Sequence, residues 1–253
     1  MKRSPAKSLS FDKRLFASLL FCFLIIPAII TVTHEGGHYV AARMQGHGNA
    51  RLHYNHTDTG RNAIIDGYRA VKQRNKQAIA NHQPFAEQEL YNKLHEQYEG
   101  LWEAYKDWKF TSREAFLYAA GPMVNLLTAL IGLGLLLYFR SSFRQAAELK
   151  PGQWLIIFGA TSCYQYILTL MAVLFHPLFD PDFRTDAYKV SVHFGLYPWT
   201  FNILEGIFGG WTLWFAFKFV PQGQKFILLV AGITGIAAGT ALWWYYLGPL
   251  LLP

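Results

Sequence analysis

Long stretches with almost no charged residue constrain this chain more than any other feature of its sequence. A helix needs roughly 20 consecutive apolar residues to cross the hydrocarbon core of a bilayer. Five windows approach or exceed this length, the fourth of them interrupted only by Glu205: 15–33, 115–139, 151–175, 194–217 and 226–253. Hydrophobic residues make up 52% of the chain and charged residues only 15%, as is typical of a membrane protein. The sequence therefore predicts an all-α fold, a polytopic transmembrane helical bundle of about five spans.

These spans divide the chain into four segments. We expect a basic N-terminal tail (1–14), a first transmembrane helix (15–45), a polar insert (46–114) and the remaining transmembrane helices (115–253). The apolar run of the first span is longer than that of a secretory signal, so we expect this span to be retained.

The insert is expected to be a small, mostly helical extramembrane segment. Residues 46–57 alternate in character, which indicates a short strand or hairpin. Apolar and aromatic residues then recur every three or four positions from Phe85 to Trp108, which predicts an amphipathic helix. Its apolar face can pack on a helical partner at about 63–80, which we favour, or lie on the membrane surface with Trp102 and Trp108 at headgroup depth.

The sequence His34-Glu35-Gly36-Gly37-His38 lies at the end of the first span. Residues i and i+4 share one face of a helix, so both imidazoles can bind one ion while Glu35 lies beside them. Two histidines, one further protein ligand and a water suit catalytic Zn²⁺, and the glutamate then serves as general base. Ionisable residues inside a membrane helix are rare and usually functional. A di-iron histidine box would need further histidine clusters in other spans, which the sequence does not contain.

The third zinc ligand is expected on the same side of the membrane as this motif. If consecutive spans alternate in direction, that side also holds the segments 118–127 and 176–190. The second of these contains Asp180, Asp182 and Asp186. Asp186 is favoured because it begins a predicted helix, which would fix the direction of its carboxylate, whereas Asp180 and Asp182 flank a proline in a turn.

Together these motifs resemble those of the site-2 protease family of intramembrane zinc metalloproteases. The family's zinc motif appears as HEGGH (34–38), and its Gly-Pro-x-x-Asn element appears as GPMVN (121–125). Its Asn-Pro…Asp-Gly element is similar to DPDFRTDA (180–187), with Asp180 in place of the usual Asn and Ala187 in place of the usual Gly. The resemblance implies that Asp186 is the third ligand and that Asn125 contacts the substrate or the oxyanion. A helix-to-helix polar contact is the other role that the sequence allows for Asn125.

The expected function is therefore that of an intramembrane zinc endopeptidase, a hydrolase that cleaves peptide bonds within or next to transmembrane segments. Its expected partners are a transmembrane protein or peptide substrate and the lipid bilayer, in a bacterial cell (inner) membrane. The alternative is a non-catalytic membrane protein of the same fold that acts as a metal-binding or regulatory partner. No nucleic-acid partner is expected, because the basic residues behind the net charge of +7 lie mostly in tails and loops beside the spans.

Two arguments about the orientation of the chain disagree. The N-terminal tail and the loops around Arg140–Lys150 and Lys218–Lys225 are basic, so the positive-inside rule assigns them to the cytoplasm and the zinc site to the outer face. The family resemblance implies instead that the site lies near the cytosol. We keep the charge-based orientation as the expectation.

Overall fold

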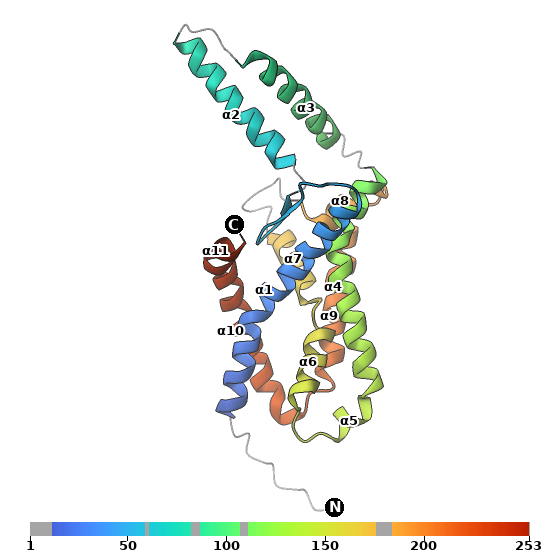
Figure 1. The fold of residues 1–253 in the computed structure, drawn as a ribbon. Coiled ribbons are helices and arrows are strands. Elements are labelled where there is room, and N and C mark those ends of the chain that lie inside the picture. Colours follow the sequence, from blue (N-terminus) through green and yellow to red (C-terminus); the bar gives the residue numbers. More distant parts are fainter. Residues whose placement is uncertain (1–11, 59–60, 82–86, 107–110, 176–183, 253) are drawn as a thin grey trace, which may run out of the picture.

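The structure is a computed structural model of the 253-residue chain, and it describes residues 12–58, 61–81, 87–106, 111–175 and 184–252. These residues form mainly helices (Figure 1). The elements are, in chain order, α1 (Lys13–Met44), β1 (Arg51–Leu52), β2 (Thr57–Asp58), α2 (Arg61–Ala80), α3 (Gln88–Lys106), α4 (Ser112–Tyr138), α5 (Arg140–Gln145), α6 (Pro151–Ala160), α7 (Tyr164–Phe175), α8 (Asp186–His193), α9 (Thr200–Phe217), α10 (Gln222–Leu242), the π-helix η2 (Trp243–Leu247) and α11 (Gly248–Leu251).

Within the described residues, four helical segments are long and apolar enough to cross a membrane. They are α1, α4, α6 with α7, and α10 with η2 and α11. The protein is thus an α-helical membrane protein, and the prediction of a helical bundle is confirmed at this level.

The prediction of a fifth span over 194–217 is wrong in its extent. Gly195 adopts a left-handed backbone conformation (φ +68°) just after α8 ends, so this apolar window is not one helix. The helix in this region, α9, has 18 residues and includes the polar Asn202 and Glu205, which lower its hydropathy. It packs on α7 and α8 with one face, while Ile203, Ile207 and Trp214 on its other side are exposed.

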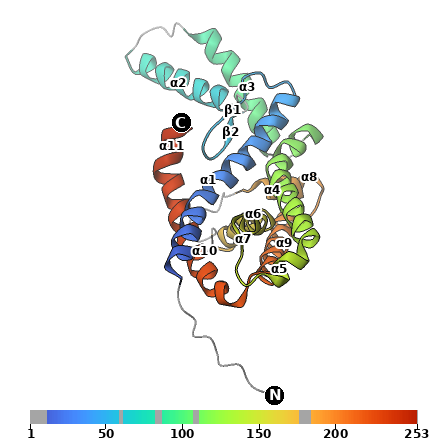
Figure 2. The same cartoon turned by 60° about the horizontal axis from the view of Figure 1, so that its bottom comes forward.

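Small residues bring the long helices into close contact. Figure 2 shows α1 between α10 and α4, and these are the two helices on which it packs most extensively. A Cβ atom on Gly235 would overlap Phe23, and one on Gly239 would overlap the carbonyl of Leu24. The backbones of α1 and α10 therefore approach more closely than larger residues would permit.

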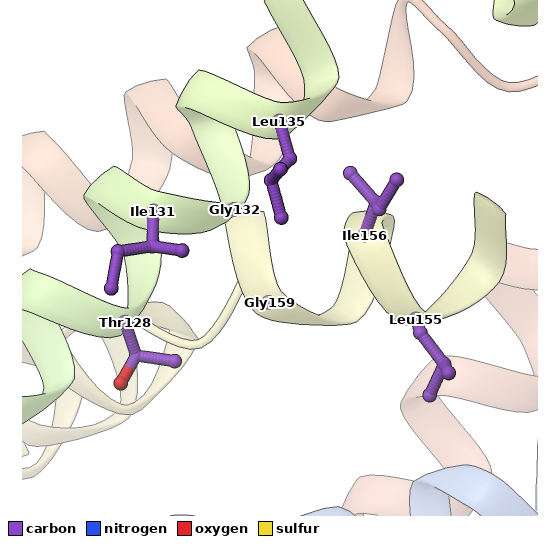
Figure 3. A pocket seen from close by; sticks show the side chains of 7 residues that line it. All are labelled: Thr128, Ile131, Gly132, Leu135, Leu155, Ile156 and Gly159. Atoms are coloured by element: carbon purple, nitrogen blue, oxygen red, sulfur yellow. The ribbon is translucent and has the colours of Figure 1, made fainter. Parts of the chain in front are cut away.

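The crossing of α4 and α6 uses glycine in the same way. A Cβ on Gly132 would overlap the backbone of Ala160. Beside this crossing lies a pocket of about 250 Å³ whose lining is almost wholly apolar (Figure 3). Its lining residues are Thr128, Ile131, Gly132, Leu135, Leu155, Ile156 and Gly159. Because none of them is ionisable, the pocket is not a candidate for catalytic chemistry.

The two ends of the bundle differ in character. The start of α1, helix α5 and the connection from α9 to α10 lie at one end (Figure 1). The basic residues in and next to these elements, Arg140, Arg144, Lys150, Lys218 and Lys225, therefore lie at the end of the bundle where α1 begins. The hairpin β1–β2, the helix α8 and the projecting pair α2 and α3 lie at the other end.

Helices α2 and α3 pack on each other as an antiparallel pair that extends away from the bundle (Figure 1). Aromatic rings fill part of their contact: Tyr68 of α2 stacks on His95 and Tyr98 of α3, with ring centroids 5.4 and 4.5 Å apart. This is the packing arrangement that the sequence favours for the amphipathic helix. Trp102 and Trp108, the side chains expected at headgroup depth in the other arrangement, lie outside the described side chains.

The β1–β2 hairpin connects the first span to the C-terminal helices. Its strands pair antiparallel, with Leu52 opposite Thr57. At its tip, the Tyr54 N–H donates to the carbonyl of Leu252, and the Trp243 indole N–H donates to the carbonyl of Tyr54, both at 3.1 Å. The hairpin is thereby fixed across one end of the bundle.

Candidate metal centre

The site begins with the last three turns of α1, where His34 and His38 lie on one face as their spacing predicts. Their Nε2 atoms are 3.2 Å apart. The Nδ1–H of His38 donates to the backbone carbonyl of Leu117 on α4, at 2.7 Å. This hydrogen bond fixes the His38 ring so that Nε2 faces His34, and in neutral His38 it leaves Nε2 unprotonated.

Asp186 reaches the histidines from the first turn of α8. The hydroxyl of Thr185 caps this helix by accepting a hydrogen bond from the Tyr188 N–H, at 3.0 Å. Asp186 Oδ2 lies 3.1 Å from His38 Nε2 and 3.4 Å from His34 Nε2.

The second carboxylate oxygen of Asp186 has its own partner. Oδ1 lies 3.7 Å from the Lys189 ammonium, which also lies 4.1 Å from the centre of the Tyr118 ring. Partial burial raises the pKa of Asp186, but His38, His34 and Lys189 outweigh this effect and hold the pKa well below its usual range. The side chain is therefore an ionised carboxylate with one oxygen directed at the histidines.

The three facing atoms have the spacing of ligands around one small cation. Two ligands of a tetrahedral centre with bonds of 2.0–2.1 Å lie about 3.3 Å apart. The three distances among His34 Nε2, His38 Nε2 and Asp186 Oδ2 are 3.1, 3.2 and 3.4 Å. Gly121 of α4 leaves room for this cluster, since a Cβ there would overlap His38 Nε2 and lie 2.7 Å from His34 Nε2.

Glu35 lies next to the cluster and is 8% exposed. A carboxylate oxygen of Glu35 and the ring nitrogens of both histidines lie within 4.8 Å of one another, a grouping that could hold a metal ion. The Thr57 hydroxyl of β2 contacts Glu35 twice, donating to its backbone carbonyl at 2.8 Å and lying 3.3 Å from Oε2. The β-hairpin therefore helps to position the acid.

Asn125 of α4 lies behind His34 and is 2% exposed. Its amide nitrogen is 3.2 Å from His34 Nδ1 and 3.2 Å from Gln165 Oε1 of α7. The backbone carbonyl of Asn125 accepts hydrogen bonds from Ser162 Oγ (3.3 Å) and Cys163 Sγ (3.6 Å). These two residues lie between α6 and α7. The segment that joins α6 to α7 is thus hydrogen-bonded to α4 at Asn125.

The structure brings together the five side chains singled out from the sequence, namely His34, Glu35, His38, Asn125 and Asp186. Their assigned roles remain predictions. The alternative ligands Asp180 and Asp182 lie outside the described residues.

Several contacting residues were not predicted from the sequence, among them Lys189, Thr57 and Gln165. The contact of Lys189 with Asp186 could have been predicted, because Lys189 follows Asp186 by three positions in a helix that the sequence predicts. Thr57 and Gln165 had no such signal, since each reaches the site from a separate element.

Comparisons of the chain with protein-family models, with curated proteins and with solved structures found no match. The function is therefore inferred from the chemistry of the site.

Proposed function

We propose that this protein is an intramembrane zinc endopeptidase of the site-2 protease type, with His34, His38 and Asp186 as zinc ligands and Glu35 as the catalytic acid–base. The observation that carries this proposal is the convergence of three potential ligand atoms within 3.4 Å of one another, beside a buried glutamate, in a membrane helix. A glutamate next to the ligands is needed for hydrolysis and not for a purely structural metal site.

Zinc fits this donor set better than the other common cations. Two imidazoles and one carboxylate are a common set of protein ligands in catalytic zinc sites, whereas magnesium and calcium prefer oxygen ligands alone. Bound zinc would polarise the scissile carbonyl and supply an activated water. The Leu117 carbonyl orients His38, and Lys189 holds the other oxygen of Asp186, so that Oδ2 alone faces the histidines.

Glu35 carries the proton transfers in this proposal. Its carboxylate accepts a proton from the attacking water as general base and later donates this proton to the departing amine as general acid. The contacts from Thr57 limit the motion of Glu35. Asn125 is proposed to support the substrate or the oxyanion in addition to its contact with His34.

The proposed substrate is a transmembrane protein or peptide in the same bilayer, which we take to be a bacterial inner membrane. A transmembrane helix hides its carbonyls in its own hydrogen bonds, so it must unwind locally before cleavage. The freed backbone groups then need partners, and the β1–β2 hairpin, which contacts Glu35 through Thr57, presents strand backbone beside the acid.

The test measures zinc content and peptide cleavage in the same detergent-purified samples. The wild type is expected to hold about one zinc per chain and to cleave a transmembrane peptide. Glu35→Gln should keep the zinc and lose cleavage, whereas His34→Ala and His38→Ala should lose both. Zinc without cleavage of any transmembrane peptide would favour a non-catalytic metal-binding protein, and a folded wild type that takes up no zinc would overturn the proposal.

A further inference from the structure

The two histidines of the site are held by different kinds of partner. His38 Nδ1 faces the backbone carbonyl of Leu117, and a carbonyl oxygen can only accept a hydrogen bond. The proton of neutral His38 is therefore fixed on Nδ1, and Nε2 is free to bind a metal. His34 Nδ1 faces the side-chain amide of Asn125, and an amide can either donate or accept.

The present hydrogen bonds select one tautomer of His34. The amide nitrogen of Asn125 lies 3.2 Å from Nδ1 and donates to it, so the proton of neutral His34 lies on Nε2. The acceptor of that proton is Asp186 Oδ2, which lies 3.4 Å from Nε2. Each of these hydrogens therefore has an acceptor in this arrangement.

Metal binding requires the other tautomer. A metal bound to His34 Nε2 needs that nitrogen unprotonated, which moves the proton to Nδ1, and Nδ1–H then needs an acceptor. Asn125 supplies this acceptor if its side-chain amide rotates by about 180°. The amide oxygen then takes the place of the amide nitrogen and faces Nδ1–H. The Asn125 oxygen would then face Gln165 Oε1, so Gln165 must turn as well and donate its own N–H.

We propose that Asn125 and Gln165 form a coupled amide pair that positions His34 for the metal and turns as a unit when the metal binds. The inference rests on the zinc site proposed above and adds Gln165 as a positioning residue. Asn125 is almost completely buried, so bulk water cannot readily replace either partner. Ser162 and Cys163 donate hydrogen bonds to the backbone carbonyl of Asn125, which does not move when the side-chain amide turns. These bonds keep the start of α7, and with it Gln165, close to the amide.

The test is the zinc affinity of detergent-purified variants, measured by competition with a chromophoric chelator. Asn125→Leu removes the acceptor for Nδ1–H and should weaken zinc binding by about 10- to 100-fold, the usual cost of losing such a partner. Asn125→Asp presents only acceptor oxygens and should bind zinc at least as tightly as the wild type. Thr128→Val, on the same helix, is the matched control and should leave the affinity unchanged, because the Thr128 hydroxyl donates to the backbone carbonyl of Val124 in its own helix.

Gln165 is tested by a double-mutant cycle. Gln165→Met should weaken zinc binding by about 2- to 10-fold, as expected for one hydrogen bond, and should have no further effect in the Asn125→Leu background. An equal loss in both backgrounds would show that Gln165 does not act through Asn125 and would overturn its role. Weakening by Asn125→Asp as large as that by Asn125→Leu would overturn the tautomer argument.

A second measurement does not depend on any substitution in the amide pair. The wild type is labelled with ¹⁵N-histidine and examined by NMR with and without zinc, with His34→Ala used for assignment. The His34 proton should lie on Nε2 in the metal-free protein and on Nδ1 after zinc is added, while His38 keeps its proton on Nδ1. A His34 proton on Nδ1 in both states would overturn the proposal while leaving the zinc site itself intact. A folded wild type that takes up no zinc would overturn the zinc site and this inference together.

Discussion

Gly121 lies directly against His38: a Cβ atom on this glycine would overlap the His38 Nε2 atom that faces Asp186. The same Cβ would lie 2.7 Å from His34 Nε2. Gly121→Ala should therefore push both imidazoles away from Asp186 and abolish or strongly reduce zinc binding. Elemental analysis of the purified variant measures this directly.

Gly134→Ala is the matched control on the same helix, since a Cβ at Gly134 meets nothing within 4 Å. This variant should keep its full zinc content and equal or exceed the wild type in thermal stability, because alanine favours a helix over glycine by about 0.5–1 kcal/mol. Normal zinc binding by Gly121→Ala would mean that the histidines do not need the space beside this glycine.

The two glycines between the histidines should respond in opposite ways to substitution. A Cβ on Gly37 would lie 2.6 Å from the carbonyl oxygen of Ala120 and 2.9 Å from Val124, both on α4, whereas one on Gly36 meets nothing within 4 Å. Gly37→Ala must force α1 and α4 apart, which should cost about 1–3 kcal/mol, as overpacking usually does. Gly36→Ala should stabilise the protein by up to about 1 kcal/mol. Thermal unfolding in one detergent compares the two, and equal effects would contradict the close contact of α1 with α4.

The sequence was sufficient to predict the part of the site that follows from regular geometry. His34 and His38 share a helix face because of their spacing, and Asn125 and Asp186 come near them because consecutive spans reverse direction. The prediction of a fifth span over 194–217 was wrong because a hydropathy window does not detect a turn. The chain turns at Gly195, in a left-handed conformation, between α8 and α9.

Contacts that depend on tertiary packing had no signal in the sequence. Gln165 faces Asn125 only because α6 gives way to α7 within one apolar window. Thr57 reaches Glu35 only because the hairpin folds back over α1 and is fixed at Tyr54. Such contacts join elements whose relative position is set by the packing of the whole bundle.

The carboxylate ligand is predicted to be Asp186 and no other aspartate of its segment. Asp186→Ala removes the one oxygen that faces both histidines, so zinc affinity should fall by several orders of magnitude. Asp180→Ala and Asp182→Ala serve as controls in the same segment and should retain zinc. Chelator competition on the three variants decides the assignment, and zinc loss in either control with normal binding by Asp186→Ala would transfer the ligand role.

Thr57 is predicted to affect turnover without affecting the metal. Valine matches threonine in shape but has no hydroxyl, so Thr57→Val loses the hydrogen bond to the Glu35 carbonyl and the contact with Oε2. A single hydrogen bond of this kind contributes about 0.5–1.5 kcal/mol, so kcat should fall by about 2- to 10-fold while zinc content stays at the wild-type level. Thr57→Ser keeps the hydroxyl and should stay near the wild-type rate. If serine and valine lowered kcat equally, the methyl group and not the hydroxyl would be the important contact. Zinc loss in Thr57→Val would instead mean that the hairpin holds the metal ligands and not only the acid.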